Sequence, residues 1–257
     1  MKASESNPNY PSKVREMTNY TIREIKKVCK DIGPRPSGEE NERKAQDYVA
    51  DSMSKVADSV VKEKFELHPK AFMGWVPLDV ILMTISVILT LLSYFDVLPS
   101  ASTAFSVVSV VLTSLAIIFT FFEFLLYKKY LDPFFPNRET YNVVCTRNAA
   151  GETKRRIVFS GHIDSAYEWY FTHLGGGKLL TTMIALAFGA IAITLAASIV
   201  SFFDVPNGVR VTAIVVLFVC LIPILMCSIL VNWKLCVPGA NHNLPRVFAS
   251  MSVLRYM

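Results

Sequence analysis

Four long apolar segments constrain this chain more than any other feature. They cover residues 76–95, 103–127, 179–203 and 211–233. Each reaches about 20 residues, which is the length that a helix needs to cross a hydrocarbon core. The alternative is four buried core helices, but these would leave the chain no polar face for water. The sequence therefore predicts a multi-pass integral membrane protein with four transmembrane helices, and its first expected partner is the lipid bilayer.

Ionisable residues are rare in these segments. Asp79 and Glu123 occur near segment ends, where a charged group can reach the membrane interface. No ionisable residue is therefore expected deep in a span, and this disfavours a transporter. The tryptophans Trp75 and Trp233 stand at the edges, as in the aromatic belts of membrane proteins.

The order of the segments predicts the topology. Residues 96–102 and 204–210 are short turns, so the spans pair into two hairpins and all long polar segments lie on one side. The flanking basic residues on that side are Lys62, Lys64, Lys70, Lys128, Lys129, Arg138, Lys178, Lys234 and Arg246, against Arg210 alone on the other. By the positive-inside rule, the polar domain and both termini are cytoplasmic. Residues 1–20 contain no apolar secretory core, so we expect no cleaved signal peptide.

Charge and cysteine content exclude several classes of protein. The net charge of +5 is concentrated beside the spans, where it meets anionic lipid. No basic stripe with interleaved aromatic residues occurs, so nucleic acid is excluded as a partner. The cysteines are Cys29, Cys145, Cys220, Cys227 and Cys236, without a C-x-x-C pair. This usage is typical of a reducing compartment and argues against a disulfide framework or a cysteine zinc site.

The polar segments show a mixed α and β pattern. Residues 14–30 have a helical period, and Ser37 with Glu40 has the spacing of a capping box that opens a second helix. A third helix is expected after residue 237. Strands are predicted at residues 61–67, 141–146 and 156–160, the last two as a hairpin. We expect one bare sheet edge that is prone to pair with other chains.

The pentapeptide from Gly161 to Ser165 is the strongest chemical signal. It follows the apolar run 157–160 and contains His162 and Asp164, two residues apart. Histidine supplies a nitrogen ligand to a metal, and a nearby aspartate holds the imidazole in one tautomer and orientation. The pattern is typical of the start of a hydrolytic metal site.

Four motifs occur in a defined order: Gly33-Pro34-Arg35-Pro36-Ser37-Gly38, Tyr141-Asn142-Val143-Val144, residues 157–165, and Val237-Pro238-Gly239-Ala240-Asn241. In this order and spacing the chain resembles the co-catalytic di-zinc aminopeptidases related to glutamate carboxypeptidases, family twenty-eight of the metallopeptidases. The resemblance covers nearly all the polar sequence and corresponds to the N-terminal portion of such a catalytic domain. It implies an α/β fold: a partial zinc-exopeptidase sheet with flanking helices, interrupted by two transmembrane hairpins.

The implied domains follow the chain. They are residues 1–75 as the N-terminal part of the peptidase-like domain, 76–127 as the first transmembrane hairpin, 128–178 with the strands and the His162 motif, 179–233 as the second hairpin, and 234–257 as a truncated continuation.

The resemblance assigns roles to three residues. His162 matches the first zinc ligand, and Asp164 matches the carboxylate that orients the site. His242 stands where the family has an aspartate that bridges two zinc ions. Neutral imidazole has one free lone pair, so His242 cannot span two metals, and a solvent-exposed role for it is favoured over ligation. Complete family members hold two zinc ions; here we expect at most one, bound weakly.

The family's glutamate pair, later aspartate and final histidine have no counterpart in the 257 residues, so we expect a fragment or a degraded copy without a general base. Two functions stay open. One is a membrane-anchored zinc aminopeptidase-like protein, acting on a peptide's free amino terminus but inactive or incomplete as given. The other is a non-catalytic membrane protein that binds a partner. The substrate side chain and the oligomeric state also stay open.

Overall fold

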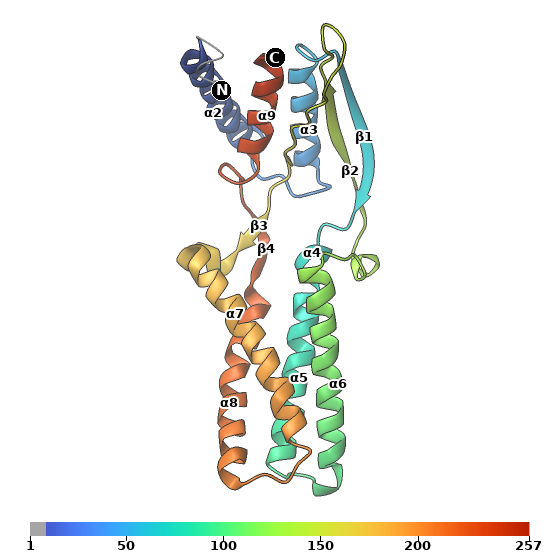
Figure 1. Cartoon of the computed structure of the whole chain (residues 1–257), viewed down its shortest axis with the longest axis vertical. Coiled ribbons are helices and arrows are strands. Elements are labelled where there is room, and N and C mark those ends of the chain that lie inside the picture. Colours follow the sequence, from blue (N-terminus) through green and yellow to red (C-terminus); the bar gives the residue numbers. More distant parts are fainter. Residues whose placement is uncertain (1–8, 257) are drawn as a thin grey trace. The chain divides into compact units, whose positions relative to one another are not determined.

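The computed structural model describes residues 9–256. The chain divides into two compact units, each built from separate stretches of sequence (Figure 1). We call Met1–Pro69, Asn137–Tyr167 and Trp233–Met257 the polar unit. We call Lys70–Pro136 and Glu168–Asn232 the helical unit.

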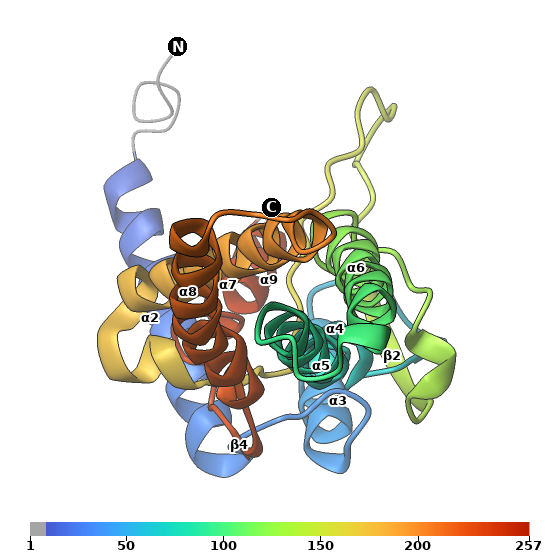
Figure 2. The same cartoon turned by 90° about the horizontal axis from the view of Figure 1, so that it is seen from below.

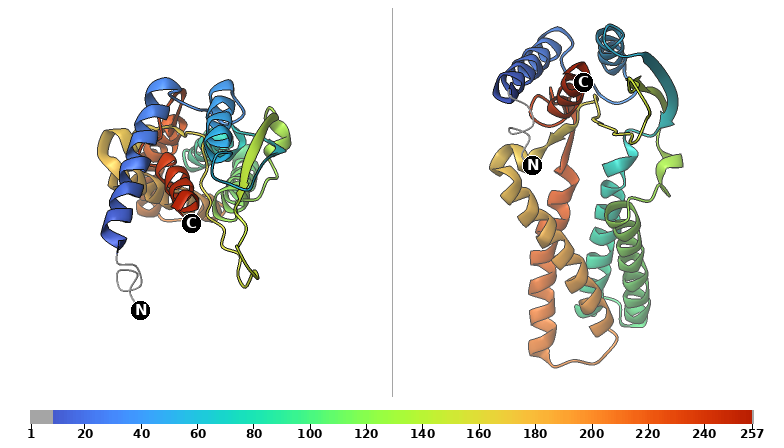
Figure 3. Two further views of the ribbon diagram at one scale, coloured as in Figure 1. Left: turned by 90° about the horizontal axis from the view of Figure 1, so that it is seen from above. Right: turned by 45° about the horizontal axis from the view of Figure 1, so that its top comes forward.

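Three helices of the polar unit enclose its apolar core. They are α2 (Tyr10–Asp31), α3 (Glu40–Met53) and α9 (Leu244–Tyr256). Helices α2 and α9 lie side by side, in blue and red in Figure 3. The core consists of Tyr20, Val28, Val49, Met53, Leu244, Val247, Phe248 and Met251. The predicted helices near residues 14–30 and after residue 237 are confirmed, because each buries an apolar face in this core.

The expected capping box of α3 is wrong. The helix begins at Glu40, and its N-cap residue is Glu39 rather than Ser37. The Ser37 hydroxyl instead donates to Oδ2 of Asp164, and the backbone N–H of Gly38 donates to Glu42 at 2.6 Å. The Ser37 side chain is therefore engaged by a distant partner, and Glu42 accepts the N–H of Gly38 locally.

One antiparallel pair of strands lies against α3. Strand β1 (Ser59–Leu67) pairs with β2 (Arg138–Thr146), with Ser59 opposite Thr146 and Leu67 opposite Arg138. These strands contain the predicted residues 61–67 and 141–146. A second two-stranded sheet joins β3 (Tyr167–Trp169) to β4 (Val231–Cys236).

The predicted strand at residues 156–160 is wrong. This segment is irregular, and Ile157, Val158 and Phe159 are 64%, 79% and 47% exposed. An apolar run becomes a central strand only when strands flank it and layers cover it. In the described chain β1 and β2 pair with each other, so the expected hairpin with 141–146 and the zinc-exopeptidase sheet are not confirmed.

Four helices of the helical unit are long and apolar enough to cross a membrane. They are Ala71–Tyr94, Pro99–Leu125, Tyr170–Val200 and Asn207–Ile229. The first span consists of α4 (Ala71–Gly74) and α5 (Val76–Tyr94). The second span includes α6 (Ser102–Phe119) and a π-helical turn, Thr120–Leu125. The third span is α7 (Tyr170–Val200), and the fourth is α8 (Asn207–Met226) with the turn that follows it. The four predicted spans are therefore confirmed as helices of membrane-crossing length and composition, and their orientation stays a prediction.

The third span begins at Tyr170, nine residues before the predicted start at 179. Gly175 and Gly176 interrupt its helical geometry, and Gly176 has a φ of +67° that L side chains rarely adopt. Gly175 and Gly176 therefore form a kink inside α7.

Hydroxyl groups fill the centre of the bundle. Helix α5 contacts α6, α7 and α8 (Figure 2). Ser109 of α6 bonds Ser86 and Thr90 of α5 at 2.6 Å each, and Ser198 of α7 at 2.7 Å. All four residues are buried. Small hydroxyl residues at helix contacts allow close approach and supply hydrogen bonds across the interface in an apolar medium.

Candidate functional site

His162 lies in a chain of side-chain hydrogen bonds in the polar unit. Its Nδ1 is 2.8 Å from Oδ1 of Asp164, and the hydroxyl of Ser37 donates to Oδ2 of the same carboxylate at 2.7 Å. An ionised carboxylate accepts hydrogen bonds and cannot donate them, so this contact assigns the proton to Nδ1. The Nε2 atom of His162 keeps its lone pair and can serve as a metal ligand. Asp164 is placed to hold this ring in one orientation.

Asn243 joins both histidines of the site. Its amide nitrogen donates to the backbone carbonyl of Asp164 and lies 3.3 Å from Nδ1 of His162, while its amide oxygen bonds Nδ1 of His242. Asn243 is buried, and the two imidazole rings are 6.0 Å apart between centroids and nearly perpendicular. The structure therefore brings His162 and His242 together. The sequence did not indicate Asn243, because an asparagine beside a histidine is a common pair without a spacing signal.

Arg35 is the centre of the framework around these residues. Its side chain is fully buried and donates to the carbonyls of Ile163 at 2.8 Å, Gly33 at 2.5 Å and Pro238 at 2.8 Å. Burial lowers the pKa of the guanidinium below its ordinary value, and these three carbonyls compensate for the water that the charge has lost. Arg35 thereby connects three of the four sequence motifs.

Gly239 fits closely against this arginine. Its φ is +69°, and a Cβ atom there would stand 3.2 Å from Nη2 of Arg35 and 3.3 Å from Cβ of Ser165. A side chain at this position would have to adopt a left-handed conformation in a space that is already filled. The glycine of the Val237–Asn241 motif is thus explained by packing.

Glu42 attaches the remaining motif to the first. Its Oε2 accepts the N–H of Gly38 and, at 2.8 Å, the hydroxyl of Thr140, which precedes Tyr141. Gln46 donates to the same hydroxyl at 2.9 Å. Burial raises the pKa of the Glu42 carboxyl, although both hydrogen bonds oppose the shift. Glu42 therefore connects the first motif to the residue that directly precedes the Tyr141–Val144 motif.

The site brings together two nitrogen donors among the described residues. In the described part of the chain, no group of three or more His, Cys, Asp or Glu side chains is placed to hold a metal. Catalytic zinc ordinarily has three protein ligands, and structural zinc has four. His162 and His242 supply two nitrogen donors, while Asp164 is engaged by Ser37 and by His162. Of the other histidines, His173 pairs with Glu168 at 3.5 Å in the helical unit.

Comparison with known proteins gives no match among family models, curated proteins or solved structures. The assignment to the metallopeptidase family therefore stays a proposal, supported by the motif network.

Proposed function

We propose that this chain is a membrane-anchored zinc aminopeptidase-like protein whose site binds at most one zinc ion weakly and does not turn over peptides by itself. The observation that supports the proposal is the convergence of three motifs, far apart in sequence, on Arg35 and the His162–Asp164 pair.

The residues of the site have distinct tasks in this proposal. His162 offers Nε2 to the metal, and Asp164 with Ser37 holds the ring in the tautomer that permits it. Asn243 connects the His242 ring to the backbone carbonyl of Asp164, beside His162. A zinc ion, where bound, supplies Lewis-acid polarisation of a scissile carbonyl. His242 has one free lone pair and cannot bridge two ions. The proposal gives the site no glutamate as general base, a group that is typically worth about a hundredfold or more in rate.

Zinc titration of the purified 257-residue chain tests the metal assignment. The chain is stripped of metal in detergent and titrated against a chromophoric chelator. We expect one weakly bound zinc ion that His162→Ala removes. His173→Ala is the matched control, because this histidine pairs with Glu168 in the helical unit. Unchanged zinc binding in His162→Ala would contradict the proposal.

Hydrolysis of amino-acid amides tests the missing activity. We expect no turnover by the chain as given and no rescue by His242→Asp alone, because a restored bridging carboxylate does not supply the general base. Robust zinc-dependent hydrolysis that His162→Ala abolishes would show that the site is complete.

Partner binding is the second candidate, and the exposed run from Ile157 to Phe159 favours it. Three consecutive large apolar residues in an irregular, exposed segment are suited to pairing with a strand of a second copy. Light scattering in detergent tests this: we expect self-association that Val158→Lys reduces and that Thr153→Lys, a polar position nearby, leaves unchanged. A monomer in all three samples would contradict this candidate.

A further inference from the structure

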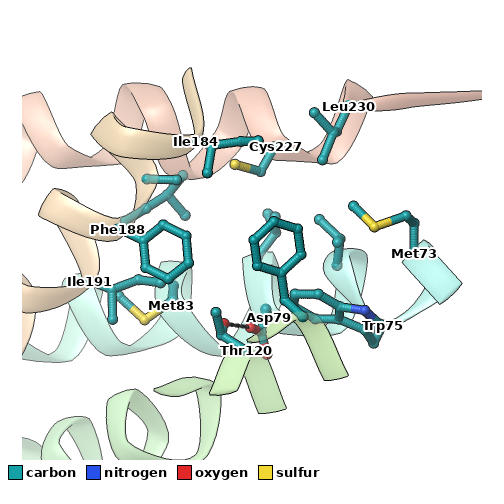
Figure 4. Close-up of a pocket in the computed structure, with 15 residues that line it drawn as sticks. Met73, Trp75, Asp79, Met83, Thr120, Ile184, Phe188, Ile191, Cys227 and Leu230 are labelled. Carbon is teal, nitrogen blue, oxygen red and sulfur yellow. Dashed lines mark hydrogen bonds between the residues drawn. The ribbon is translucent and has the colours of Figure 1, made fainter. Parts of the chain in front are cut away.

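The helical unit contains a cavity that the peptidase resemblance does not explain. Its volume is about 80 Å³, and residues of all four spans line it (Figure 4). The walls are almost entirely apolar; they include Met73, Met83, Ile191 and Ile224. A dry apolar cavity of about 150 Å³ can bind benzene, so a space half that size suits a short aliphatic chain.

Asp79 is the one residue with a carboxyl group among those that line the cavity. It is 7% exposed, and Figure 4 shows its carboxyl beside Thr120, whose hydroxyl donates to Oδ2 at 2.7 Å. The other oxygen, Oδ1, is buried and has no hydrogen-bond partner among the residues that the structure describes. A buried polar atom without a partner is costly, and an ionisable group inside a membrane bundle marks a functional site by default. The sequence placed Asp79 near a segment end, but its span starts at Ala71, so Asp79 lies about two turns inside.

The surroundings of Asp79 favour a positive charge. Three aromatic residues line the cavity: the Trp75 and Phe124 rings are 6.4 Å apart, and the Phe124 and Phe188 rings are 6.0 Å apart. Aromatic faces attract cations, and more strongly where water is excluded. No lysine, arginine or histidine of the described chain lines this cavity, so the carboxylate has no counter-ion there.

We propose that the cavity binds a small primary amine with a short apolar chain. The ammonium group donates to Oδ1 of Asp79 and faces the aromatic rings, and the alkyl chain fills the space toward Ile184 and Ile191. This pairing satisfies the open carboxyl oxygen and gives the ionised form of Asp79 a counter-charge inside the bundle.

A bare metal cation fits less well. Calcium takes six to eight oxygen ligands, and magnesium needs near-octahedral coordination. Among the side chains that line this cavity, Asp79 and Thr120 alone carry oxygen. The ligand must therefore contribute apolar contacts as well as charge.

Binding of n-butylamine and butan-1-ol to the full chain tests the proposal. The two compounds have the same length, but only the amine is charged at neutral pH. Ligand-observed NMR titration in nanodiscs gives both dissociation constants. We expect tighter binding of the amine, and Asp79→Asn should weaken amine binding by about tenfold or more while leaving the alcohol unchanged.

Two further variants control this result. Asp96→Asn removes the same charge from an exposed turn of the helical unit and should not change amine binding. Ala187→Leu fills part of the cavity and should weaken the binding of both compounds without changing the carboxyl group of Asp79. Helical circular dichroism establishes that each variant is folded, and Asp79→Asn removes a buried charge without changing shape, so it should fold.

Equal binding of amine and alcohol, or equal amine binding by the parent chain and Asp79→Asn, would overturn the proposal and leave a merely apolar cavity. Binding of neither compound would overturn it as well. Displacement of the amine by sodium chloride, but not by choline chloride at the same ionic strength, would show an inorganic cation site instead.

Discussion

Arg35 and Ser165 exchange two hydrogen bonds across 130 residues of sequence. The backbone N–H of Arg35 donates to the Ser165 hydroxyl at 2.7 Å, and the N–H of Ser165 donates to the Arg35 carbonyl at 2.8 Å. The exchange aligns the loop that contains the arginine with the loop that contains His162. The position of the candidate site therefore depends on a residue that takes no part in its chemistry.

Replacing this arginine should loosen the whole site. Arg35→Met keeps the volume but leaves the carbonyls of Ile163, Gly33 and Pro238 without their donor. Each buried unsatisfied group costs about 1–3 kcal/mol, so we expect the polar unit to lose about 3 kcal/mol or more. Hydrogen exchange of the His162 loop measures the loss. Arg43→Met, an exposed arginine on α3, is the control, and equal protection in both variants would refute the role of Arg35.

Glu42 should make stability depend on pH. Burial raises its folded-state pKa above the unfolded value, so the folded state binds more protons in the window between the two. Stability therefore falls as pH rises from the unfolded pKa of about 4.5 through the raised folded value. We expect Glu42→Gln to flatten this fall in denaturant unfolding of the polar unit.

Glu40→Gln is the matched control for that slope. Glu40 is exposed, and its hydrogen bond and charge contact with Lys44 lower its pKa. Its contribution has the opposite sign, because it is lost as pH falls through the depressed folded value. The same slope in the parent chain and in Glu42→Gln would show that the Glu42 carboxyl does not titrate as the structure indicates.

Ser109 should stabilise the helical bundle. It bonds hydroxyls on α5 and α7, and Ser109→Ala removes these contacts from a buried position. Hydrogen bonds between membrane helices contribute about 0.6 kcal/mol each and up to about 1.7 kcal/mol, so we expect a loss of about 1–2 kcal/mol. Titration with a denaturing detergent, followed by helical circular dichroism, measures it. Ser114→Ala on the same helix should cost less, and an equal cost would argue against the network.

Both short turns of the bundle should face away from the cytoplasm. The basic residues that flank the polar segments predict this orientation. Ser100 and Asn207 are exposed, so single cysteines at these positions in a cysteine-free background should react with an impermeant thiol reagent applied outside the cell. A cysteine at Thr153, an exposed position of the polar unit, should react only after permeabilisation. The reverse pattern would invert the topology.

Elements defined by a continuous stretch of sequence were predicted well. The four spans follow from length and hydropathy, and α2 and α9 follow from a helical period, because these properties are local. Even so, Ile22 lies within the helical period of residues 14–30 and is 46% exposed. The helix was predictable, but the exact face that packs depends on where α9 lies.

Elements that need a distant partner were not determined by the sequence. The run 156–160 has the composition of a strand but no strand beside it in the described chain, so it stays irregular. His162 and Asp164 were predicted from their spacing alone, whereas Arg35, Glu42 and Asn243 gain their roles only where separate motifs meet. The burial of Asp79 likewise depends on distant segments, because residues of three other spans line the cavity beside it. Periodicity and composition are properties of one segment; burial and the satisfaction of polar groups arise only when distant segments pack together.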